Sequence, residues 1–178
     1  MSEVARLPRT WQAPEASMPT THTFESFFED EKDRLLRVLA VITGSRAEAE
    51  DIAQEAFTRV LERWDSVGEM EDPTAYLYRT AMNGFRSEYR RAARAIKRTV
   101  GIGPAVDVFQ AVEDRELAAQ ALARLTPRQR AALVLTEALG YSGEETGALL
   151  GIKASTVWAL THQARTAMRA TTEENPDG

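Results

Sequence analysis

The chain has 178 residues, enough for one ordinary domain or two small ones, and its 43% hydrophobic and 28% charged residues are typical of a globular protein. It has no cysteine and only two widely separated histidines, which excludes a disulfide framework, a thiolate metal site and a histidine metal motif, and its net charge of −5 argues against indiscriminate coating of nucleic acid. No apolar run approaches the roughly 20 residues that cross a bilayer and residues 1–23 do not resemble a secretory signal, so we expect a cytoplasmic protein without membrane insertion.

Two amphipathic helices are predicted before residue 65. Apolar residues recur at helical spacing over residues 24–42, with a break suggested near Glu31, and Gly44 ends this helix. Ser45 and Glu48 form a predicted capping box that begins a second helix. The outer face of that helix carries acids and amides, namely Asp51, Gln54, Glu55, Thr58 and Glu62.

A third helix with a basic face is predicted after the polar segment 65–71. Asp72 caps it and Pro73 takes the first helical position. Opposite its apolar side lie Arg79, Asn83, Arg86, Ser87, Arg90 and Arg94, with Arg91 beside them. Exposed arginines are often only hydrated. A run of side chains that are nearly all positively charged, however, repels itself unless an anion binds, so this face predicts nucleic-acid binding.

Residues 99–111 contain glycines and a proline without a helical stripe and predict a linker. A helical spacing of apolar residues resumes over residues 112–125. Thr126 and Gln129 then predict a capping box for a helix that runs to Leu139. The polar tail, residues 171–178, is expected to fray.

Residues 142–170 have the dimensions of a helix-turn-helix, although an ordinary helical hairpin fits this segment alone. Ser142 and Glu145 cap its first helix, Gly151 breaks it, and Ser155 is expected to cap the second. In such a unit the start of the second helix lies near base edges in the major groove. The residues placed there or near phosphates are Lys153, Ser155, Thr156, Trp158, His162 and Arg165.

Nothing in the sequence indicates catalysis. The carboxylates have no histidine, metal partner or identifiable pocket that would make an acid and base pair. The segment 101–103 is too short for a nucleotide loop and does not join a strand to a helix. We therefore expect no enzyme activity, no cofactor and no metal.

Four segments resemble, in order and spacing, the conserved regions of extracytoplasmic-function (ECF) sigma factors in the bacterial sigma-70 superfamily. They read EAEDIAQEAF at 48–57, AYLYRTAMN at 75–83, LTPRQR at 125–130, and GYS, LGI and TV within 140–157. The resemblance implies an all-α fold of two small helical domains joined by a flexible linker. The expected organisation is a leader at 1–23, sigma region 2 at 24–98, the linker at 99–111, sigma region 4 at 112–170 and a tail at 171–178.

The resemblance also assigns roles and partners. It implies that core RNA polymerase binds Asp51, Gln54, Glu55 and Phe57. The arginine-rich helix would read and melt the minus-10 element of promoter DNA. Within it, Ser87 stands where the family commonly has aspartate. The loop 65–71 would capture a flipped base. The helix-turn-helix would read the minus-35 element, with a recognition helix that is poor in positive charge. An anti-sigma factor is a further expected partner.

Two other functions remain compatible with the residues. A free-standing helix-turn-helix regulator would form a symmetric dimer on a palindromic site. A sigma-like interaction module would bind polymerase or a regulator without reading DNA, and its arginine-rich helix would then be dispensable for promoter opening.

Overall fold

The computed structural model describes residues 23–96 and 120–174, with side chains described for residues 23–91 and 120–170, and contains no strand within these ranges. The N-terminal half comprises α1 (Phe24–Thr43), α2 (Arg46–Leu61), α3 (Trp64–Val67) and α4 (Pro73–Ile96). The C-terminal half comprises α6 (Pro127–Leu133), the π-helical turn η1 (Val134–Ala138), α7 (Gly143–Leu150) and α8 (Ala154–Glu174). The all-α fold is therefore confirmed, while the leader 1–22, the linker 99–111 and residues 175–178 lie outside the described residues.

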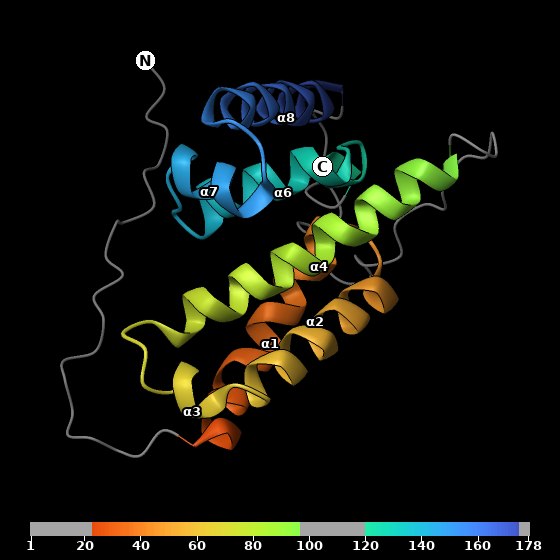
Figure 1. The fold of residues 1–178 in the computed structure, drawn as a ribbon. Helices are drawn as coiled ribbons and strands as arrows, with labels where there is room; N and C mark the ends of the chain where they lie inside the picture. The colour runs from red at the N-terminus through yellow and green to blue at the C-terminus, as the bar shows by residue number, and fades with distance from the viewer. Residues whose placement is uncertain (1–22, 97–119, 175–178) are drawn as a thin grey trace.

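The helices form two layers that meet along α1 and α4. Figure 1 shows α1, α2 and α4 packed together on one side and α6, α7 and α8 on the other. Helix α6 contacts α1, and α7 contacts α4. This arrangement brings the C-terminal half directly against the helix that carries the predicted minus-10 residues.

Helix α1 is continuous, so the break suggested near Glu31 is wrong. Glu31 lies within α1, where its Oε1 accepts a hydrogen bond of 3.2 Å from the Thr74 hydroxyl of α4. A tertiary contact therefore holds this acidic position within the helix. The end at Gly44 is confirmed, because this glycine has φ 74° and its N–H donates to the Ala40 carbonyl.

Two predicted caps differ from the structure. Ser45 Oγ accepts from the Glu48 N–H, but the Ser45 N–H donates to Thr43 Oγ1 at 3.1 Å, so only half of that capping box forms. Helix α8 begins at Ala154, one residue before the expected cap Ser155, and the Thr156 and Val157 N–H groups donate to the Lys153 carbonyl.

The other two predicted capping boxes are confirmed. In one, the Thr126 side chain accepts from the Gln129 N–H and Gln129 Oε1 accepts from the Thr126 N–H. In the other, Ser142 and Glu145 exchange the same two bonds at 3.1 and 2.7 Å. The hydrogen bonds to Ser142 lower the pKa of the Glu145 carboxyl. These boxes fix the starts of α6 and α7.

Two boundaries were also predicted incorrectly, and one helix ends where expected but in a different helical form. Part of the polar segment 65–71 is helical, because α3 forms where Trp64 packs on the Phe27 ring at 5.1 Å between centroids. The helix predicted to end at Leu139 finishes as the π-helical turn η1, in which the Leu139 N–H donates to the Val134 carbonyl. Residues 171–174, expected to fray, continue α8.

The two halves share one hydrophobic core rather than burying two separate ones. Leu35, Leu39 and Ile42 of α1 are fully buried. Buried residues of the C-terminal half join the same cluster, namely Ala131, Ala132, Leu135, Leu150 and Val157. Burial of this apolar surface stabilises the contact between the halves.

Tyr78, which α4 places in this core, gives a test of the packing. Its side chain is 1% exposed, its hydroxyl has no hydrogen-bond partner, and burial raises its pKa from 10.0 to about 12. In the unfolded chain tyrosine ionises near pH 10, so stability is unaffected below pH 10 and falls as the pH rises from 10 to 12. A pKa difference of two units between the folded and unfolded chain lowers the free energy of unfolding by about 2 to 3 kcal/mol.

We expect Tyr78→Phe to remove this loss of folding stability above pH 10. Stability at pH 7 should be equal or slightly higher, because the substitution removes no hydrogen bond. Urea denaturation of both proteins at several pH values between 7 and 12 would measure the difference. Parallel pH curves for the two proteins would contradict the prediction.

Candidate functional site

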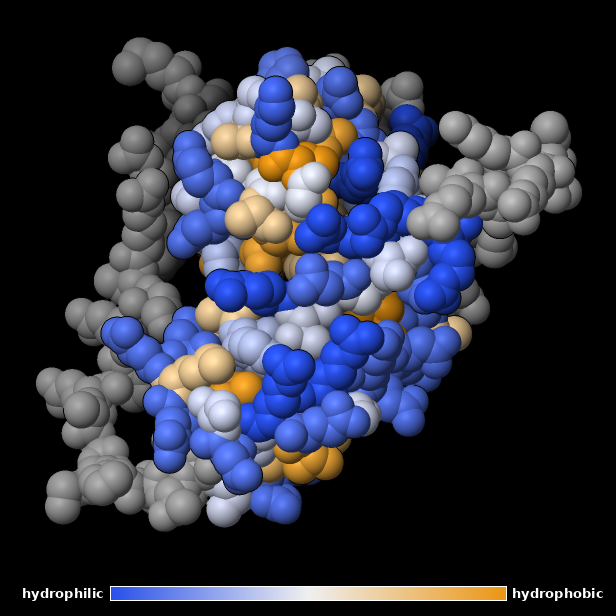
Figure 2. Space-filling view, viewed as in Figure 1, coloured by the Kyte–Doolittle hydropathy of each residue, from blue (hydrophilic) through white to orange (hydrophobic). Residues whose placement is uncertain are grey.

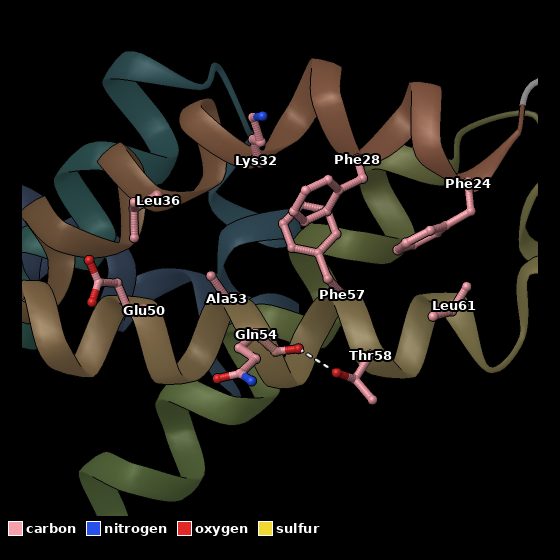
Figure 3. Close-up of a pocket in the computed structure, with 10 residues that line it drawn as sticks. All are labelled: Phe24, Phe28, Lys32, Leu36, Glu50, Ala53, Gln54, Phe57, Thr58 and Leu61. Atoms are coloured by element: carbon pink, nitrogen blue, oxygen red, sulfur yellow. Dashed lines mark hydrogen bonds between the residues drawn. The ribbon is translucent and has the colours of Figure 1, made fainter.

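An open apolar groove separates α1 from α2. It encloses about 460 Å³, and Figure 3 shows the Phe28 and Phe57 rings meeting across it. Their centroids are 4.8 Å apart in an edge-to-face arrangement. Phe24 and Leu61 lie at one end, and the exposed fraction of Leu61 is 52%. Exposed apolar surface of this kind is typical of a protein-binding site.

The predicted acidic and amide residues of α2 lie on the helix that forms one side of the groove. Asp51, Gln54 and Glu55 are all exposed, as the helical pattern predicts, and Gln54 lines the groove. Glu55 pairs with Arg59 one turn along at 2.6 Å, whereas Phe57 is buried and forms part of the floor. The four predicted polymerase residues are therefore close together but present different chemistry. Their role remains a prediction.

The basic residues of α4 form a surface that we call the arginine face, defined by Arg79, Asn83, Arg86, Ser87, Arg90 and Arg91. Figure 2 shows hydrophilic side chains over the region of α4. Arg79, Asn83 and Arg90 are exposed, while Arg86 and Ser87 are half-buried. Arg86 donates to Asn83 Oδ1 at 3.3 Å, and Arg91 pairs with Glu88 at 2.6 Å. The side chain of Arg94 lies outside the described residues.

A separate cavity lies around α3 and the start of α4. It encloses about 400 Å³ and its lining includes Asp65, Ser66, Met70 and Tyr76. Part of the loop 65–71 therefore lines a hollow with both polar and aromatic walls, which is the combination that an unpaired base needs for hydrogen bonding and stacking. Capture of a base there remains a prediction.

The C-terminal half contains the expected helix-turn-helix. Gly151, with φ 65°, ends α7, and a Cβ on Gly147 would lie 2.7 Å from the Ile152 carbonyl oxygen. The turn therefore requires small residues where α7 and α8 meet. Trp158 packs beside Gly143, where a Cβ would lie 3.0 Å from the indole Nε1, and is still 56% exposed.

The residues predicted to read the minus-35 element form an exposed surface along the first half of α8. Lys153, Ser155, Thr156, Trp158 and His162 are all exposed. Arg165 is also exposed but pairs with Glu137 of η1. This surface is polar and aromatic, with few unpaired cations among the described residues.

Sequence reasoning missed the residues that join the two halves. Arg130 is only 4% exposed and binds backbone carbonyls of both halves, while Arg128 stacks on the Tyr89 ring at 5.0 Å. The position of Arg130 among the buried residues of α6 was an available signal, because a charged residue in an apolar stripe needs partners. The groove formed by the partly buried Phe24 and Phe28 and the exposed Leu61 was also missed as a surface.

The described residues contain neither a metal-binding cluster nor a membrane-spanning helix. Within residues 23–96 and 120–174, no cluster of histidine or acidic residues has the arrangement of a metal site. None of the helices in those ranges is long and apolar enough to cross a membrane.

Comparison with known proteins identifies the family. Residues 27–95 match Sigma-70 region 2, and residues 115–168 match Sigma-70, region 4. The RNA polymerase sigma-E factor of Streptomyces avermitilis is 33% identical over 149 residues, which cover 82% of this chain and 83% of that protein. The chain belongs to the ECF sigma factors. The ECF RNA polymerase sigma factor SigL of Mycobacterium tuberculosis is 31% identical over 158 residues, covering 84% of this chain and 88% of SigL.

The fold of this sigma factor is also similar to a solved structure. The sigma factor RpoE of Bartonella quintana, solved with the anti-sigma factor NepR, matches with a TM-score of 0.63 and 22% identity, covering 84% of this chain and 96% of that one. As an ECF sigma factor, the chain directs promoter-specific transcription initiation with RNA polymerase. Sigma factors are in general not enzymes.

Proposed function

We propose that this sigma factor uses three separate surfaces to initiate transcription. The groove between α1 and α2, beside the acidic face of α2, binds core RNA polymerase. The arginine face binds the unpaired minus-10 strand, and the exposed start of α8 reads the minus-35 element. Region 2 would occupy residues 24–98 and region 4 residues 112–170, and the protein would work in the cytoplasm, without a cofactor or enzymatic activity.

The observation that carries this proposal is the open groove beside Asp51, Gln54 and Glu55. Its lining is mainly aromatic and aliphatic, its polar members include Lys32, Glu50 and Gln54, and Asp51 and Glu55 are exposed on the same helix as Gln54. Protein interfaces typically combine such an apolar centre with a polar rim, and the apolar residues supply most of the affinity. A basic, partly apolar helix of the polymerase is the kind of partner that fits this surface.

The arginine face has the chemistry of a nucleic-acid surface rather than of a second protein interface. Arg79 and Arg90 are exposed on the same helix, and within residues 23–91 and 120–170 neither forms an ion pair with a carboxylate. Preferential binding of an unpaired strand there would shift the duplex toward melting without any bond chemistry.

We also propose an anti-sigma factor as a partner. The Bartonella RpoE, which has a similar fold, was solved with one. An inhibitor that filled the apolar groove of this chain would compete directly with polymerase.

The first test measures binding of labelled sigma factor to core RNA polymerase by fluorescence anisotropy. We expect Leu61→Asp to weaken binding at least about tenfold, which corresponds to about 1.4 kcal/mol, because it places a charge in the apolar groove. Leu61 is exposed, so the fold should be retained.

Met70→Asp is the matched control, since Met70 is a similarly exposed apolar residue outside the groove, with an exposed fraction of 42%. It should bind core polymerase like the wild type. Equal binding by both variants would reject the groove as the polymerase site, and no binding by the wild type would reject the polymerase role.

A further inference from the structure

The exposed face of α8 is apolar at its centre. Ser155, Trp158, Ala159 and His162 are all exposed and recur at steps of three and four residues, so they share one face of the helix. Figure 1 shows α8 on the far side of α6 and α7 from α1, α2 and α4. Trp158 and Ala159, in the middle of this face, therefore lie at the surface of the described structure.

A glycine holds the Trp158 indole in place. A Cβ at Gly143, the first residue of α7, would lie 3.0 to 3.2 Å from three consecutive indole atoms, Nε1, Cε2 and Cζ2. The indole thus packs against the start of α7 on one side and is still 56% exposed. A large side chain that is already fixed loses little conformational entropy when a ligand covers it. This arrangement is typical of a binding surface.

The longer α8 side chains that could read purines are bound within the chain or lie far along the helix. Arginine pairs with guanine, and glutamine with adenine, through two hydrogen bonds each. Arg165, however, forms an ion pair with Glu137 of η1, and Gln163 Oε1 accepts from Gln129 Nε2 of α6 at 3.3 Å. Arg169 lies in the second half of α8, away from the start that faces base edges. The start of the recognition helix therefore presents mainly small and apolar side chains.

We infer that Trp158 and Ala159 read thymine in the minus-35 element through its C5-methyl group. Thymine is the one standard DNA base that presents a methyl group in the major groove, and apolar side chains distinguish it by contact with that carbon. The small Ala159 lets the helix approach the bases, and the fixed indole packs against the methyl group. Gly143 is a positioning residue, because it acts through Trp158. This inference rests on the proposed function of α8 as the minus-35 reader and adds the base that its centre recognises.

Replacing thymine by deoxyuridine tests the inference, because deoxyuridine forms the same base pair but lacks the methyl group. The sigma factor with core polymerase first selects duplexes from a random-sequence library, and the selected set defines the minus-35 element. Each thymine of that element, on either strand, is then replaced in turn. The wild-type holoenzyme should bind at least one of these duplexes about three- to fivefold more weakly, as expected for one buried carbon. An element without thymine, or unchanged binding of every deoxyuridine duplex, would overturn the inference.

Variants of the sigma factor assign the effect to the indole. With Trp158→Ala, the ratio of affinities for the thymine and deoxyuridine duplexes should fall close to one. Gly143→Ala should lower the same ratio, because its Cβ forces the indole to shift by a few tenths of an ångström. Gln163→Ala is the matched control, since Gln163 is exposed on the same helix but bonded to Gln129, and it should keep the wild-type ratio.

The ratio separates base reading from a merely structural role of Trp158. Because Trp158 is exposed, Trp158→Ala should retain the fold and bind core polymerase, which circular dichroism and anisotropy check. If this variant binds both duplexes more weakly by the same factor, its ratio is unchanged and the inference is overturned. Failure of the wild type to bind core polymerase, or to enrich any sequence upstream of the minus-10 element, would instead reject the proposed function itself.

Discussion

Replacing Arg79 and Arg90 together by alanine is expected to reduce open-complex formation by about two to three orders of magnitude while core polymerase binding is unchanged. Both side chains are exposed on α4, and neither lines the groove between α1 and α2. A hydrogen bond from a charged donor contributes about 1.5 to 3 kcal/mol, so two lost phosphate contacts at the lower end of that range amount to about 3 to 4 kcal/mol. The salt dependence should fall as well, by about 0.7 in the log–log slope for each contact to single-stranded DNA.

The measurement is the fluorescence of a base analogue at the melted position, recorded over a range of salt concentrations. Arg37→Ala is the matched control, because it removes an exposed arginine from α1. It should leave both the yield and the slope unchanged. Retention of open complexes by the double variant would favour an interaction module that does not read DNA. Loss of yield without a change in slope would indicate that these arginines act through something other than phosphates.

Helix starts and ends were predictable from sequence wherever the interaction is local. Gly44 ends α1 with a positive φ, and the capping box of Ser142 and Glu145 spans only three residues. Asp72 likewise caps α4, accepting from the Ala75 N–H at 2.8 Å. These interactions involve neighbours within four positions, so their signals are present in the sequence itself.

Contacts between distant residues account for the failures. Glu31 lies within α1 and its side chain accepts from Thr74, 43 positions away, while α3 forms where Trp64 meets Phe24 and Phe27. No local pattern specifies either contact. The half-formed capping box at Ser45 has a different cause, since the Thr43 hydroxyl competes for the Ser45 N–H.

The surfaces were predicted less completely than the helices. Periodicity identified Asp51, Gln54 and Glu55 as an outer face, and the structure shows them exposed. It did not reveal that Phe28 and Leu61 remain accessible beside them, because a helical pattern separates inside from outside but does not show where two helices leave a groove. The joint core was missed for a similar reason, as separate motifs do not reveal how their domains pack.

Arg130→Ala is expected to destabilise the protein by about 3 to 5 kcal/mol and to separate the unfolding of the two halves. The guanidinium is buried, and burial lowers its pKa from the ordinary value, while four backbone carbonyls accept its hydrogen bonds and stabilise the buried charge. Alanine leaves those carbonyls without a donor, and each unsatisfied buried group costs about 1 to 3 kcal/mol. Hydration of the α1 carbonyls after the halves separate recovers part of that cost, which favours uncoupling over complete unfolding.

Urea denaturation followed at two tryptophans distinguishes these outcomes, because Trp64 reports on the N-terminal half and Trp158 on the C-terminal half. Replacing Trp11 and either Trp158 or Trp64 by phenylalanine gives two proteins with one tryptophan each. Their urea transitions should coincide when Arg130 is present and separate after Arg130→Ala. Arg128→Ala, two residues earlier on α6 and exposed, is the control and should cost no more than about 1 kcal/mol for its contact with Tyr89. Coincident transitions in the alanine variant would show that the shared core, rather than Arg130, couples the halves.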